Sequence, residues 1–77
     1  MPKQPVVSGP ELIKALGHIG YEFLRQRGSH VTLVNWDTRR TVPIPVHGSK
    51  SLPPGTLAHI LRQVGIDNDE LRDSLAQ

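Results

Sequence analysis

Histidine is the residue type best placed to do chemistry in this chain, which has no cysteine and only seven carboxylates among its 77 residues. The four histidines are His18, His30, His47 and His59. No two of them stand four residues apart, as a helical zinc site would require, and no thiolate can join them. We therefore expect neither a metal nor a cofactor. General acid–base catalysis remains, since histidine readily moves protons near neutral pH.

The charges divide unevenly along the chain. Residues 1–66 carry eight basic and three acidic side chains, whereas residues 67–77 carry four acidic and one basic. A basic body suggests a polyanionic partner such as RNA, although ordinary solvated charge is the preferred interpretation of the composition alone. RNA brings its own nucleophile, the 2′-hydroxyl group. A general base together with cations that hold the phosphate is therefore enough to cut it.

His30 is the strongest candidate for that base. It follows Gly28 and Ser29 in the expected turn Gly28-Ser29-His30, and the glycine lets a backbone approach closely. The phosphate-binding candidates are Arg25 and Arg27 just upstream, with Lys50 and His47 in a later loop. From spacing alone the simpler interpretation, a histidine that only shapes a hairpin turn, is the favoured one.

Helix and strand patterns suggest how these residues are positioned. Ser8 and Glu11 form a capping-box pattern at the start of a first helix. Three strands follow, at residues 21–27, 31–36 and 40–46. Alternation places Tyr21, Phe23, Arg25 and Arg27 on one face of the first strand. Pro43 and Pro45 place the third strand at a sheet edge. Tyr21 and Trp36 could stack on bases, but a core position is the more common role for both.

The C-terminal third predicts two further helices. One opens at Pro53-Pro54, carries an apolar stripe and ends at Gly65. The other begins at Asp67, is acidic, and is expected to fray. With residues 1–7 as a frayed lead-in, we expect one domain over residues 1–77. No membrane span or signal peptide is evident, which favours a cytoplasmic protein.

The fold expected is α+β, in the order α-β-β-β-α with an extra short C-terminal helix. Its three-stranded antiparallel sheet carries the helices on one face. That is the layout of a double-stranded-RNA-binding domain, which reads RNA by its shape, phosphates and 2′-hydroxyl groups.

Two motifs carry a resemblance to a known family. The first is Arg25-Gln26-Arg27-Gly28-Ser29-His30, after a Gly-Tyr-Glu-Phe strand start. The second runs through residues 42–65: Val42-Pro43-Ile44-Pro45-Val46-His47, Lys50, Leu52, Pro54-Gly55-Thr56-Leu57 and Ile60-Leu61-Arg62-Gln63-Val64-Gly65. In their order and separation these blocks resemble the HicA-like toxins, and the resemblance covers roughly residues 6–75.

The resemblance implies a toxin of a type II toxin–antitoxin system that cuts mRNA without a metal. It also implies a HicB-like antitoxin as partner, with DNA reached only through the complex of the two. The family's catalytic histidine falls on His30. Many members have a second histidine directly after it, where this chain has Val31, so Lys50 or His47 is expected to protonate the leaving oxygen. Two alternatives stay open: an RNA-binding module that does not cut, and a domain whose main role is to bind the antitoxin.

Overall fold

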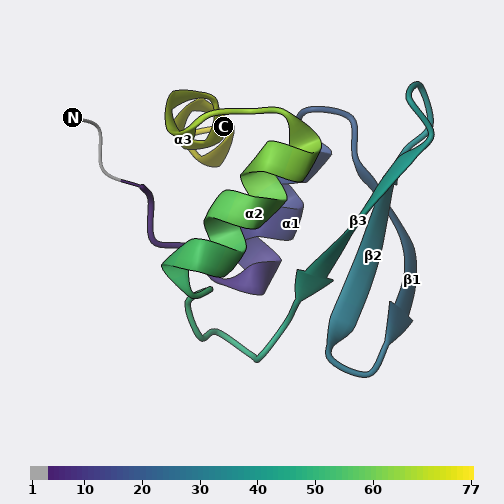
Figure 1. Ribbon diagram of the computed structural model, residues 1–77, viewed down its shortest axis with the longest axis horizontal. Helices are drawn as coiled ribbons and strands as arrows, with labels where there is room; N and C mark the ends of the chain where they lie inside the picture. Colours follow the sequence, from purple (N-terminus) through teal and green to yellow (C-terminus); the bar gives the residue numbers. More distant parts are fainter. Residues whose placement is uncertain (1–3) are drawn as a thin grey trace.

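The computed structural model describes residues 4–77. The elements follow in the order α1 (Gly9–Gly17), β1 (Glu22–Arg27), β2 (His30–Asn35), β3 (Arg40–Pro45), α2 (Pro54–Val64) and α3 (Asn68–Leu75). The strands form one antiparallel sheet in the order β1-β2-β3, and the helices cover one of its faces (Figure 1). The expected α+β architecture, with its extra C-terminal helix, is confirmed. It is consistent with a double-stranded-RNA-binding-like fold.

Local sequence signals account for where the helices begin. At α1 the amide of Glu11 donates to the Ser8 hydroxyl at 3.2 Å, and the amide of Ser8 donates to the Glu11 carboxylate at 2.9 Å. The same reciprocal box forms at α3 between Asp67 and Glu70. Both boxes satisfy amides that have no partner within their helix. Among residues 4–77, no helix has the length and apolarity that crossing a membrane requires.

The box at α1 should make stability depend on pH. Hydrogen bonds from the Ser8 amide and then the Ser8 hydroxyl lower the pKa of Glu11 below its ordinary value of 4.5. A lowered folded-state pKa stabilises the fold above the unfolded value, and this contribution is lost as pH falls through the folded value. We expect the stability advantage of the wild type over Glu11→Gln, measured by urea denaturation, to shrink between pH 6 and pH 3. Glu22→Gln, at an exposed carboxylate on β1, is the control.

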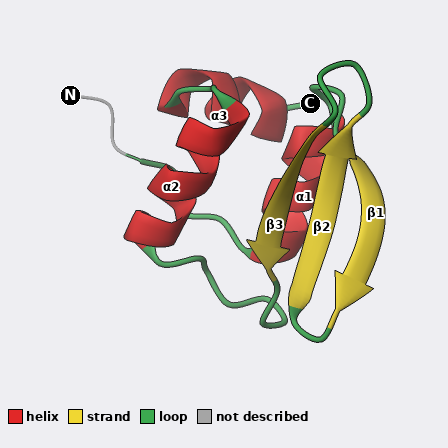
Figure 2. Cartoon of the chain, turned by 45° about the vertical axis from the view of Figure 1, so that its right-hand side comes forward, coloured by secondary structure: helices red, strands yellow, loops and turns green. Residues whose placement is uncertain are grey.

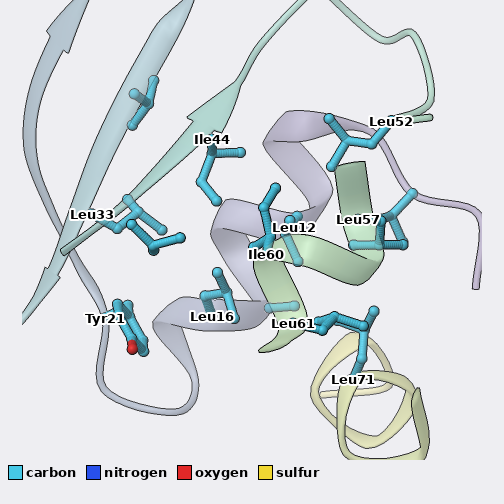
Figure 3. Close-up of a cluster of buried hydrophobic side chains, with 14 residues drawn as sticks. Leu12, Leu16, Tyr21, Leu33, Ile44, Leu52, Leu57, Ile60, Leu61 and Leu71 are labelled. Atoms are coloured by element: carbon cyan, nitrogen blue, oxygen red, sulfur yellow. The ribbon is translucent and has the colours of Figure 1, made fainter. Parts of the chain in front are cut away.

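The hydrophobic core lies between the sheet and the helices. Val31 and Leu33 of β2 and Val42 and Ile44 of β3 are at most 5% exposed, and they face the buried leucines of α1 and α2 (Figure 3). The remaining core residues are Val7, Leu12, Ala15, Leu16, Tyr21, Leu52, Leu57, Ile60, Leu61 and Leu71. No residue of β1 is fully buried. The helices therefore cover β2 and β3, and they cover the edge strand β1 least.

The two aromatic residues expected in the core behave differently. Tyr21 is 7% exposed and belongs to the core, as predicted. Trp36 is 58% exposed in the turn after β2, so the expectation of a core position is wrong for it. The reason is its place beyond the end of the strand, where the helices no longer cover the sheet.

Both ends of the described chain pack against the core. The lead-in expected at residues 1–7 lies partly outside the described residues, but Val7 is buried and its carbonyl accepts a hydrogen bond from Leu52 at 2.8 Å. At the other end the sequence predicts fraying, whereas Leu71 is fully buried. In Figure 3 its side chain points toward Leu61 of α2. Helix α3 is thus a packed element that lies against α1.

Strand β3 forms one edge of the sheet, as its prolines predict. The amide of Val46 donates to the Ser29 carbonyl, on the β2 side. Because backbone groups alternate along a strand, Pro43 and Pro45 turn their nitrogens outward, where no donor is needed. The first turn of α1 lies against the end of this strand. A Cβ added to Gly9 would stand 2.5 Å from the Pro45 carbonyl oxygen, so only glycine allows this approach.

Candidate active site

His30 is the first residue of β2 and does not lie in the turn before it. The turn consists of Gly28 and Ser29, and the paired residues on either side of it are Arg27 and His30. Gly28 has φ +59°, which suits the first position of a two-residue hairpin turn that glycine favours. The sequence had assigned His30 to the turn itself. Strand pairing instead fixes its backbone between two neighbours, so only the imidazole is free to move.

The strand register shows which side chains share a face with His30. His30 is paired with Arg27 on β1 and with Pro45 on β3, and the next pair on that face joins Thr32 to Arg25. Directly paired residues have Cβ atoms about 4.5–5.5 Å apart. Val31, between His30 and Thr32, is buried under the helices, so this face points away from them. The imidazole and both guanidinium groups therefore project from the uncovered side of the sheet, where all three residues are exposed.

A β-bulge in β1 changes one expectation about these faces. The register shifts between Phe23, paired with Leu33, and Arg25, paired with Thr32. Leu33 and Thr32 are neighbours on β2 and point to opposite faces, so Phe23 and Arg25 do as well. The prediction that both share one face is wrong because simple alternation ignores the extra residue. The bulge is what places Arg25 on the side of His30.

The loop after β3 carries the other two candidates, His47 and Lys50. It begins beside Pro45, the cross-strand neighbour of His30, and both residues are exposed. The Lys50 amide donates to the His47 carbonyl at 3.1 Å, which closes a tight turn. In Figures 1 and 2 this loop runs at the same end of the sheet as the β1–β2 turn. The fold thus brings the Gly28-Ser29 turn, His30 and this loop to the same end of the sheet.

Hydrogen bonds hold the backbone of this end while leaving its functional groups open. The Ser29 carbonyl accepts from the Val46 amide, and the Gly28 carbonyl accepts from the Gln26 side chain at 3.1 Å. Within residues 4–77, no hydrogen bond or ion pair engages the side chains of His30, His47 or Lys50. The imidazole is therefore available to a bound molecule.

The remaining histidines lie outside this group. His18 forms the C-cap of α1, and His59 is exposed on α2. Across residues 4–77, no three His, Asp or Glu side chains gather closely enough to hold a metal ion. Val31, the position at which the resemblance implies a second histidine in many family members, is 5% exposed in the core. Strand alternation directs that position away from the face of His30.

The comparison with known families supports the resemblance to HicA-like toxins that the two sequence motifs indicate. A family model described as the HicA toxin of bacterial toxin–antitoxin systems matches residues 9–66. The chain belongs to the HicA toxin family. The match contains His30, both HicA motifs and every predicted site residue, but it ends before α3. No curated protein matches the chain in sequence. As a HicA toxin, the chain is one component of a toxin–antitoxin pair.

Sequence reasoning missed the immediate neighbours of His30. Pro45 and Thr32 flank it on the sheet, and only the register reveals them. The sequence did indicate Pro45 in part, because Pro45 stands two residues before His47 in the second motif. Without a known pairing, that motif could not be placed beside His30.

Proposed function

We propose that this HicA toxin is a metal-independent endoribonuclease that cuts mRNA, with His30 as its catalytic residue. The observation that carries the proposal is the shared uncovered face of His30, Arg27 and Arg25. An imidazole beside two guanidinium groups offers proton transfer and phosphate binding in one place. Gly28 and Ser29 shape the turn that presents them.

The reaction needs no group beyond the RNA and these side chains. His30 accepts the proton of a 2′-hydroxyl, whose oxygen then bonds to the neighbouring phosphorus. The bond from phosphorus to the 5′-oxygen breaks, and an acid donates a proton to that oxygen. The products are a 2′,3′-cyclic phosphate and a 5′-hydroxyl end. Arg25 and Arg27 stabilise the charge on the phosphate as it grows. His47 or Lys50, in the loop at the same end, supplies the acid.

We further propose a HicB-like antitoxin as the inhibiting partner, acting in the cytoplasm where mRNA is found. The antitoxin would cover the end of the sheet that holds His30, and DNA would be reached only through the complex. An RNA-binding module that does not cut is the second candidate, favoured by the double-stranded-RNA-binding-like layout. Growth arrest on expression distinguishes the two, because a protein that cuts mRNA should be toxic, whereas a module that only binds RNA need not be.

Chelation tests the metal-independent route. We expect the purified toxin to cut single-stranded RNA at the same rate in excess EDTA as in magnesium, because the base and the cations belong to the chain. The matched oligonucleotide with 2′-O-methyl groups should stay intact, since it lacks the nucleophile. Cleavage that stops in EDTA and returns with a divalent ion would contradict the metal-independent mechanism. RNA that is bound but never cut would support the binding module instead.

A further inference from the structure

The turn between β2 and β3 carries features that the proposed reaction does not use. This turn, residues 36–39, lies at the opposite end of the sheet from Gly28 and Ser29 (Figure 1). Its first residue, Trp36, is 58% exposed. A large aromatic ring left in solvent forgoes the burial that would otherwise stabilise the fold.

Trp36 does not line the hollow that lies beside this turn. Asn35, Thr38 and Arg40 line an open hollow of about 410 Å³ on the helix side, together with residues of α2 and α3, but Trp36 is not part of that lining. Along β2, His30 and Thr32 alternate onto the face turned away from the helices, and Val34 follows them on that face although it is only 3% exposed. Trp36 comes directly after Asn35, the last residue of the strand. The exposed ring thus lies just beyond the end of the strand that His30 begins.

The backbone of the turn is strained next to this ring. Arg39 has φ +60° and is the one non-glycine residue among the described residues with a positive φ. Its amide donates to the Asn35 carbonyl at 2.7 Å, which holds the left-handed conformation. Glycine adopts this conformation more easily, so an arginine at this position raises the free energy of the backbone. Its guanidinium forms no ion pair within residues 4–77.

The surroundings of Trp36 favour a nucleic acid over a protein partner. A protein interface is built on a contiguous apolar patch. The other large exposed hydrophobic residues in the described chain are Val6, near its start, and Phe23, on the helix side of β1. Trp36 is therefore an exposed ring in the same turn as Arg39, whose guanidinium forms no ion pair within residues 4–77. That combination suits a base stacked on the indole with a phosphate held at the guanidinium.

We propose that Trp36 stacks on an unpaired base of the RNA substrate, while Arg39 binds an adjacent phosphate. The proposal rests on the proposed function and adds a second contact to it. Trp36 comes six positions after His30, which is about 20 Å at the rise of a β-strand. At about 3.4 Å per stacked nucleotide, this separation corresponds to roughly six nucleotides, and to fewer in an extended strand. The substrate class is thus single-stranded RNA with an unpaired base within about six nucleotides of the cut.

Trp36 is the chain's single tryptophan, so its fluorescence reports on this contact alone. The probe is a 2′-O-methyl RNA decamer, which cannot be cut whichever residue is catalytic. We expect saturable quenching of Trp36 in the wild type and in His30→Ala. Anisotropy of the labelled decamer should show affinity weakened about tenfold or more in Trp36→Ala and largely retained in Trp36→Phe. Phe23→Ala, which removes an exposed ring on β1, should bind as the wild type does.

The outcomes separate this contact from the proposed function. Binding by anisotropy without any change in Trp36 fluorescence overturns the contact and leaves the nuclease proposal standing. Fluorescence that responds to the co-encoded antitoxin and not to RNA makes the turn a protein-docking surface and also overturns the contact. If the decamer does not bind and natural RNA stays uncut, the proposed function fails and the contact fails with it. Circular dichroism of each variant verifies its fold.

Discussion

Substituting His30 with alanine should reduce the rate of RNA cleavage by about 10²–10⁴-fold, the usual contribution of a general acid or base. The imidazole is the group that we propose accepts the 2′-hydroxyl proton, and neither alanine nor glutamine can replace it. RNA affinity should change little, because Arg25 and Arg27 remain on the same face. The rate is measured under single-turnover conditions, so that it reports cleavage and not product release.

The fold should tolerate this change, which makes the result interpretable. His30 is exposed and its side chain forms no hydrogen bond with residues 4–77, so the free energy of unfolding should shift by no more than about 0.5 kcal/mol. His59→Ala, at an exposed histidine on α2, is the matched control and should cut at the wild-type rate. Full activity in His30→Ala, with His47→Ala inactive, would move the catalytic role to the loop after β3.

Leu71→Ala should lower the free energy of unfolding by about 2–5 kcal/mol, the usual effect of truncating a buried leucine. Leu71 is fully buried where α3 joins the core cluster of α1 and α2. A domain of this size has a total stability of about 4–12 kcal/mol, scaled from the usual stability per residue. The loss would therefore be a large share of the whole. Urea denaturation followed by circular dichroism measures it.

A neighbour on the same helix provides the comparison. Leu75 is half-buried in α3, and its change to alanine should cost clearly less than that at Leu71. Equal unfolding midpoints for Leu71→Ala and the wild type would show that α3 contributes little to the folded domain. The expected result would show that residues beyond the HicA match at 9–66 stabilise the part within it.

Features encoded within a few neighbouring residues could be predicted from the sequence. The caps at Ser8 and Asp67 and the end of α2 at Gly65 each depend on side chains and backbone within one turn, and the structure confirms all three. The edge position of β3 also followed from its prolines. Local physics decides these features, so no knowledge of the tertiary structure was needed.

Features set by pairing between distant segments could not be predicted in the same way. The bulge that separates Phe23 from Arg25 exists only relative to β2. That His30 belongs to β2 and not to the turn likewise depends on its paired residues, Arg27 and Pro45. For Trp36, exposure was decided by where the helices stop covering the sheet. The candidate residues were therefore named from the sequence, but their shared face required the register.

The outward-facing nitrogens of Pro43 and Pro45 also limit how chains of this toxin can associate. A sheet with two open edges can pair with another chain at each edge and so grow into a fibre. A sheet with one blocked edge can pair with only one other chain. Strand β1 is the remaining edge, and its register irregularity at the bulge disturbs regular pairing there. At high concentration these chains should therefore resist polymerisation through their sheets, even when toxin is synthesised faster than its partner.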